Sequence, residues 1–222
     1  MDLYHLGSKK RKILSSSTPG EDQIIEFPID FDKTIKDALG RSFMEKISSN
    51  DNNVYFYSDI DIQSAFKLNM EIKNAISEMQ KVGLKYGIDP PPVKLHINSN
   101  GGSIFAALSC IETIKHSPVE IHSFVEGGAA SAATLISTCC HKRFISKHSF
   151  MLVHQLRSGM WGTMEEIRDE NRNLEKITLA LEDIYLNHTN LSRSSLRRLM
   201  KHDLWLDPEE CLERGMVDSV LG

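Results

Sequence analysis

The spacing of apolar positions predicts strands that alternate with helices along most of the chain. Predicted strands, with short apolar or alternating runs, cover 54–57, 93–97, 119–125, 142–145 and 150–153. Predicted helices, with apolar residues three and four apart, cover 35–47, 62–79, 103–114, 132–137, 164–188 and 192–201. Strand, helix, strand and helix in this order are typical of parallel crossover units. The fold class predicted is therefore α/β.

Turn and cap residues set the expected ends of these elements. The first predicted helix should end at the polar cluster Ser48 to Asn53, and a loop should run from Gly83 to Pro92. The helix at 62–79 has one mostly apolar face. Its members are Ile62, Phe66, Asn69, Ile72, Ile76 and Met79. A last helix is predicted from Asp207 as N-cap, Pro208 at N1, Glu210 in a capping box and Gly215 at the C-cap.

The helix at 164–188 is long and has a polar face crowded with Glu and Arg. Its apolar positions include Ile167, Leu174, Ile177, Leu181 and Ile184. A charged face of this kind more often marks a solvated or inter-subunit helix than a binding site.

Composition places the chain among ordinary globular proteins. It has 222 residues, is 41% hydrophobic, and carries 26 Lys and Arg against 30 Asp and Glu, a net charge of −4. These values argue against wholesale disorder, collagen and coiled coil, and they favour one domain plus tails. We expect a flexible basic arm at 1–22 and a single domain at 23–222. The basic run Lys9 to Lys12 could bind nucleic acid or act as a targeting signal, but a solvated tail is the commoner explanation.

Several function classes lack their sequence signals. No run approaches the roughly 18 apolar residues that span a bilayer, and the N-terminus lacks the apolar core of a secretory signal. The expected location is the cytoplasm, with neither membrane nor nucleic acid as partner. No GxxxxGK[ST] motif occurs, so any nucleotide hydrolysis must come from another chain. The four cysteines are expected to be buried thiols rather than disulfides, and Cys139, Cys140 and His141 are not expected to bind a metal. No cofactor is predicted.

Two glycine pairs are expected between a strand and the helix that follows it. The first, Gly101-Gly102, could be only a tight turn. The second, Gly127-Gly128, precedes Ser131 in a run of very small residues. Small neighbours allow another backbone to approach the serine hydroxyl, and a helix N-terminus offers unpaired N–H groups to a developing oxyanion.

A serine nucleophile needs an adjacent base, usually a histidine held by a carboxylate. His154 is the strongest candidate because it ends the apolar strand 150–153, although a lone histidine there is more often structural. His96 and His122 lie inside strands, and His5 lies in the arm.

Three segments in this order resemble the ClpP family, the proteolytic subunit of ATP-dependent Clp proteases. They are Asn98 to Gly102, Gly127 to Ser131 and Met151 to Gln155, and the resemblance spans roughly residues 50–221. It implies that Ser131 is the nucleophile and His154 the general base. It also implies that Asp203 is the acid. Asp207 is the nearest rival for that role and is better explained as a helix cap.

The resemblance further implies an oxyanion hole made by the backbone N–H groups of Gly102 and Ala132. The implied fold is the ClpP/crotonase-like α/β fold, with repeated β-β-α units and a protruding C-terminal strand-helix handle. Homo-oligomeric assembly follows from it, as heptameric rings stacked through residues 156–162 and 164–188. A separate AAA+ unfoldase would deliver protein substrates.

Two other functions stay open on the residues alone. A crotonase-like acyl-CoA enzyme would polarise a thioester with two backbone amides, but it would not need Ser, His and Asp in this order. A catalytically silent ring or assembly subunit would not need to retain the triad.

Overall fold

The computed structural model describes residues 47–222, which form an eight-stranded mixed sheet and six helices. This confirms the α/β class, but the repeated β-β-α units are not confirmed by the element order. The basic arm, the start of the predicted domain at residue 23 and most of the helix predicted at 35–47 lie outside the described residues. The division into an arm and one domain stays a prediction.

A parallel sheet forms the centre of the fold, in the order β2, β3, β4, β5 and β8. β1 joins one edge antiparallel to β2, while β6 pairs parallel with the end of β4 and antiparallel with β7. The strands are β1 (Ile47–Asn50), β2 (Asn53–Phe56), β3 (Val93–Ser99), β4 (Ile121–Ala130), β5 (Lys142–Ser146), β6 (Phe150–Leu152), β7 (Trp205–Leu206) and β8 (Ser219–Leu221).

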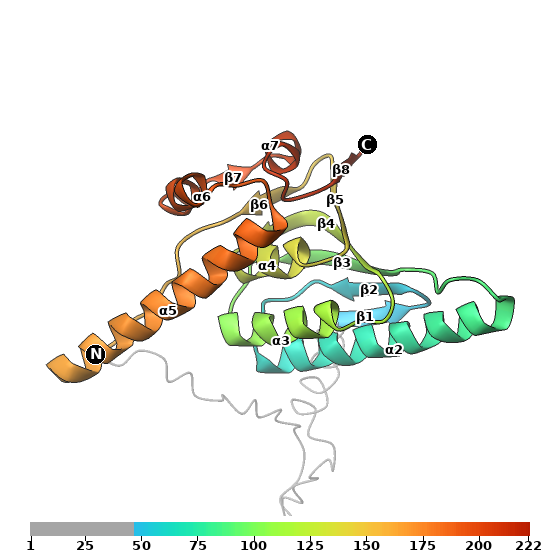
Figure 1. Cartoon of the computed structure of the whole chain (residues 1–222), viewed down its shortest axis with the longest axis horizontal. Helices are drawn as coiled ribbons and strands as arrows, with labels where there is room; N and C mark the ends of the chain where they lie inside the picture. Colours follow the sequence, from blue (N-terminus) through green and yellow to red (C-terminus); the bar gives the residue numbers. More distant parts are fainter. Residues whose placement is uncertain (1–46) are drawn as a thin grey trace, which may run out of the picture. The chain divides into compact units, whose positions relative to one another are not determined.

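The helices alternate with the strands along the chain and lie beside the sheet (Figure 1). They are α2 (Ile62–Tyr86), α3 (Ile104–Lys115), α4 (Ala132–Thr138), α5 (Met164–His188), α6 (Arg193–Met200) and α7 (Pro208–Glu213). The bounds of α5 match the predicted range. Its buried residues are Leu181, Glu182 and Tyr185, all near its C-terminal end. The N-terminal part of α5 extends away from the sheet (Figure 1).

The prediction that Ile47 ends a helix is wrong. Ile47 begins β1, which pairs with β2 through a turn at Asp51 and Asn52. Asp51 has φ 53°, the left-handed conformation that two-residue hairpin turns favour. The polar cluster therefore contains most of an edge strand as well as a turn.

The buried face of α2 matches the predicted face only in part, because Ile72, Ile76 and Met79 are buried but two other members are not. Ile62 is 82% and Phe66 68% exposed, whereas Ala65 and Leu68 are buried. The helix also continues through Gly83 and ends at Gly87, whose φ is 64°. Glycine at position 83 lets the following loop approach the helix, because a Cβ there would lie only 2.9 Å from the carbonyl oxygen of Ile88.

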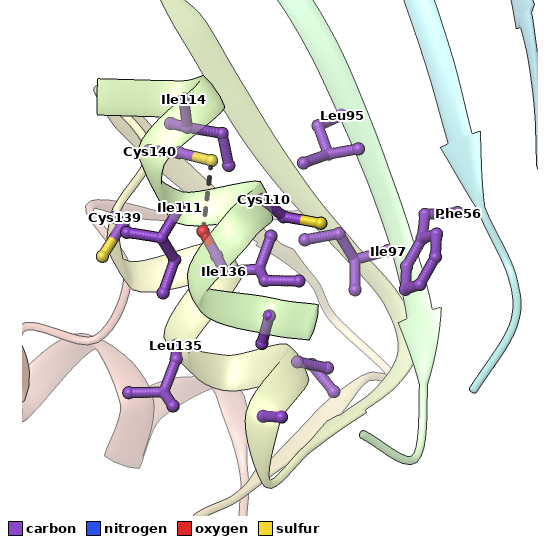
Figure 2. Close-up of a cluster of buried hydrophobic side chains, with 14 of the residues drawn as sticks. Phe56, Leu95, Ile97, Cys110, Ile111, Ile114, Leu135, Ile136, Cys139 and Cys140 are labelled. Carbon is purple, nitrogen blue, oxygen red and sulfur yellow. Dashed lines mark hydrogen bonds between the residues drawn. The ribbon is translucent and has the colours of Figure 1, made fainter. Parts of the chain in front are cut away.

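The core beside the site is formed where α3 and α4 pack on the central strands (Figure 2). Ile111, Ile114 and Ile136 are fully or almost fully buried there. All four cysteines are free and buried, as predicted, and the Cys140 thiol donates to the Ile136 carbonyl at 3.5 Å. Burial raises the pKa of the Cys139 thiol to about 11, so this thiol is protonated near neutral pH.

β4 is longer than predicted, because its last residues pair with β6. Gly128 to Ala130 align with Phe150 to Leu152. Gly127 and Gly128 therefore lie inside the strand, not between a strand and a helix. The strand runs directly into Ser131 and α4.

Candidate active site

Ser131 occupies a strained turn between β4 and α4. Its φ is 55° and its ψ −124°, although most N-cap residues are extended. Its hydroxyl does not cap the helix. The backbone N–H instead donates to the Leu152 carbonyl at 2.8 Å, which ties the turn to β6. In other enzymes a sharp strand-to-helix turn of this kind exposes the hydroxyl of a nucleophilic serine. Backbone strain of this kind also clusters at functional sites.

The turn after β3 is pressed against this elbow. Gly101 has φ 89°, and a Cβ there would lie 2.5 Å from the Ala130 carbonyl oxygen and 2.8 Å from the Ser131 Cβ. Only glycine fits this approach. The first glycine pair is thus more than a tight turn, because it brings the end of β3 to the nucleophile candidate.

Two backbone N–H groups beside the elbow have no acceptor within residues 47–222. The neighbours of Gly102 are both bonded to Ile60. The Gly101 carbonyl accepts from the Ile60 N–H at 2.7 Å, and the Ser103 N–H donates to the Ile60 carbonyl at 2.8 Å. The Gly102 N–H itself donates no hydrogen bond within the described residues. Ala132 is the first residue of α4 and is fully buried, so its N–H is one of the unpaired donors of a helix start. Unpaired backbone N–H groups are the donors that an oxyanion hole uses.

His154 follows β6 and shares a cavity of about 260 Å³ with Ser131 and Gly102. The cavity is lined by Asn100, Gly102, Ile104, Ser131, Leu135, His154, Gln155, Leu156, Arg157, Leu181, Tyr185 and Met200. His154 Nδ1 lies 2.7 Å from the Gln155 carbonyl oxygen. Because a carbonyl only accepts, the neutral ring carries its proton on Nδ1. Nε2 then has a lone pair, as a general base requires.

Asp203 is not brought to His154 in this structure. Its carboxylate is paired with Arg157, and both side chains are exposed. The Gln155 carbonyl oxygen is the partner of His154 Nδ1, a place that the family resemblance assigns to the Asp203 carboxylate. Asp207, the rival acid, accepts from the Glu210 N–H at 2.8 Å and caps α7, as predicted. The C-cap of α7 is Arg214 rather than the predicted Gly215. Gly215 is the next residue and has φ 66°.

Three residues at the site were not singled out from the sequence. Arg157 holds Asp203, while Thr134 and Tyr185 are hydrogen-bonded to each other beside the elbow. Thr134 is three residues after Ser131, a spacing at which a side chain can reach back to the turn. No local signal marks Tyr185, because its partner lies on another helix.

Residues 47–222 contain no cluster of three His, Cys, Asp or Glu side chains that could hold a metal ion. His141, the neighbour of the vicinal cysteines, accepts from the Ile121 N–H through Nδ1 at 3.0 Å. No helix in the described residues is long and apolar enough to cross a bilayer.

Two relatives of the chain are both named as Clp protease proteolytic subunits. The chain is 33% identical over 131 residues to the ATP-dependent Clp protease proteolytic subunit 1 of Streptomyces avermitilis, covering 58% of this chain and 60% of the relative. It is 28% identical over 131 residues to the ATP-dependent Clp protease proteolytic subunit of Deinococcus radiodurans, covering 58% of this chain and 64% of the relative. The similarity thus spans about three fifths of each relative's length. A Clp protease family model matches residues 48–222, and the chain therefore belongs to the Clp protease family.

Proposed function

We propose that this chain is a serine endopeptidase subunit in which Ser131 is the nucleophile, His154 the general base and Asp203 the acid. The observation that carries the proposal is the strained, uncapped elbow at Ser131, which shares one cavity with His154. The Clp protease family and the names of the two relatives support it.

The chemistry follows from the atoms around the elbow. His154 Nε2 accepts the Ser131 hydroxyl proton as the oxygen attacks a peptide carbonyl, and the imidazolium then protonates the leaving amine. The N–H groups of Gly102 and Ala132 receive the oxyanion. Water repeats the same steps on the acyl-enzyme and releases the second product.

Asp203 has to leave Arg157 before it can orient His154. The His154 ring also has to exchange the Gln155 carbonyl for the carboxylate. We infer that the structure represents a resting arrangement, and that assembly or substrate completes the triad. Catalytic hydrogen bonds often tighten only in the bound complex.

We further propose that the chain works as a homo-oligomer of stacked heptameric rings in the cytoplasm. The mostly exposed N-terminal part of α5 supports this, because Met164 is 64% exposed and Ile167 36% exposed there. A separate AAA+ unfoldase would supply unfolded protein, since the sequence lacks a P-loop and the relatives are named ATP-dependent.

Labelling with a serine-directed phosphonate, read by intact mass, tests the nucleophile. We expect one adduct on the wild-type protein and none on Ser131→Ala, with assembly unchanged. Ser194→Ala, which removes an exposed hydroxyl on α6, is the matched control and should label like the wild type.

The two alternatives predict different results. A silent ring subunit would stay unlabelled even when assembled and supplied with its unfoldase. An acyl-CoA enzyme would bind a CoA thioester saturably without a covalent serine adduct. Either result would overturn the peptidase assignment.

A further inference from the structure

A buried chain of hydroxyl groups connects α5 to the elbow. The Tyr185 hydroxyl lies 2.5 Å from Thr134 Oγ1, and Thr134 Oγ1 lies 2.6 Å from the Ser131 carbonyl oxygen. The threonine has one proton, and the carbonyl can only accept it. The order is therefore fixed: Tyr185 donates to Thr134, and Thr134 donates to Ser131.

This chain is shielded from water. Thr134 is fully buried and Tyr185 is 3% exposed. Burial also raises the pKa of Tyr185, so the phenol keeps its proton. The Thr134 backbone N–H donates to the same Ser131 carbonyl at 3.0 Å. In an environment of low dielectric, successive hydrogen bonds of this kind polarise and strengthen one another.

The carbonyl held in this way belongs to a particular peptide group. The Ser131 C=O and the Ala132 N–H lie in one rigid trans plane and point in opposite directions. Fixing the carbonyl therefore fixes the direction of the Ala132 N–H, the buried donor without an acceptor described above. It also resists rotation of the strained Ser131 ψ.

We propose that Thr134 and Tyr185 are positioning residues, which hold the 131–132 peptide so that its N–H points at the oxyanion. The catalytic half of this inference rests on the proposed peptidase function. The structural half, that the two hydroxyls maintain the elbow conformation, stands independently of activity.

Three variants separate hydroxyl chemistry from packing. Thr134→Val keeps the shape and removes the donor, Thr134→Ser keeps the donor, and Tyr185→Phe removes only the first hydroxyl. Peptide hydrolysis by the assembled protein is measured as kcat and KM. Tyr57→Phe is the matched control, because Tyr57 donates to Glu126 at 2.6 Å and does not line the cavity.

Loss of an oxyanion donor lowers kcat by about 100- to 1000-fold, and a misdirected donor should cost less. We expect kcat to fall about 10- to 100-fold in Thr134→Val, with KM within about twofold of wild type. Thr134→Ser should recover most of that loss. Tyr185→Phe should lie between them, and Tyr57→Phe should match the wild type.

Unchanged kcat in Thr134→Val, or failure of Thr134→Ser to rescue it, would overturn the catalytic half. Crystal structures of the wild type, Thr134→Val and Thr134→Ser decide the structural half. The inference requires the left-handed Ser131 conformation in the wild type and the serine variant, and its loss or disorder in the valine variant. An ordered left-handed Ser131 in Thr134→Val overturns it. These structures also decide the structural half if the wild-type protein proves not to be a peptidase.

Discussion

At the scale of single residues, the site combines one strained serine with neighbours that leave it accessible. The Ser131 hydroxyl makes no capping bond, although serine is a favoured N-cap. Gly101 lies so close to the elbow that no side chain fits. The hydroxyl is therefore not used by the helix, and the close approach of the turn requires glycine at position 101.

Replacing Arg157 should release the acid of the proposed triad. The ion pair with Asp203 is exposed, and such pairs contribute little, about 0–1 kcal/mol. Arg157→Ala should therefore raise the rate of phosphonate labelling modestly, by up to about fivefold. A small phosphonate is the suitable probe, because Arg157 also lines the cavity.

Salt supplies a second measurement of the same contact. Higher ionic strength screens exposed pairs, so it should speed labelling of the wild type and have less effect on Arg157→Ala. Arg172→Ala, which removes a similarly exposed pair with Asp169 on α5, is the control. Slower labelling of Arg157→Ala, or an equal salt effect in both proteins, would show that the pair does not restrain Asp203.

At the scale of elements, a buried carboxylate joins α5 to α6. Glu182 is 2% exposed and accepts from Arg197 at 2.7 and 3.0 Å and from Arg193 at 2.5 Å. The hydrogen bonds from Arg197, together with those from Arg193, hold the pKa of Glu182 below its ordinary value of about 4.5. This contact, together with the buried Leu196 and Met200, holds α6, and Asp203 lies three residues after α6 ends.

The lowered pKa predicts a pH dependence of stability. Because the folded pKa lies below the unfolded one, the stabilisation is present above about pH 4.5 and is lost as the pH falls through the folded pKa. Glu182→Gln should lower stability at neutral pH and flatten its decline under acid, as measured by denaturant unfolding from pH 7 to pH 3. Glu175→Gln, at an exposed position on α5, should keep the wild-type profile. A Glu182→Gln profile as steep as the wild type would contradict this role.

At the scale of the whole molecule, α5 packs only partly against the rest of residues 47–222. Its buried residues lie in the last two turns, and its first turns expose Met164 and Ile167. In the proposed ring assembly, this apolar side would contact a neighbouring copy.

Ile167→Asp tests whether this surface joins two rings. The substitution should change the thermal stability of the single chain little, because Ile167 is already 36% exposed. It should shift the assembly from double rings to single rings in native mass spectrometry. Asp169→Asn on the same helix should leave the double ring intact. Double rings that persist in Ile167→Asp would assign the contact to another surface.

Local periodicity predicted most elements because their patterns are short-range. The alternation in β3 and the capped helix α5 are both found where expected. Prediction failed where a distant strand decided the outcome. Gly128 to Ala130 have weak strand propensity and belong to β4 because β6 pairs with them. Ile62 and Phe66 belong to the apolar face predicted for α2, but nothing in the described fold covers them.

The sequence alone determined the kinds of elements, the small residues around Ser131 and the order of the motifs that resemble the family. Only the tertiary structure decided how the site is held. Thr134 meets Tyr185 across 51 residues, and Arg157 meets Asp203 across 46. Contacts at such separation depend on how helices pack and strands pair, and they leave no trace in local spacing. For that reason the candidate nucleophile and base could be named from the chain, whereas the present partner of Asp203 and the hydroxyl chain behind the elbow could not.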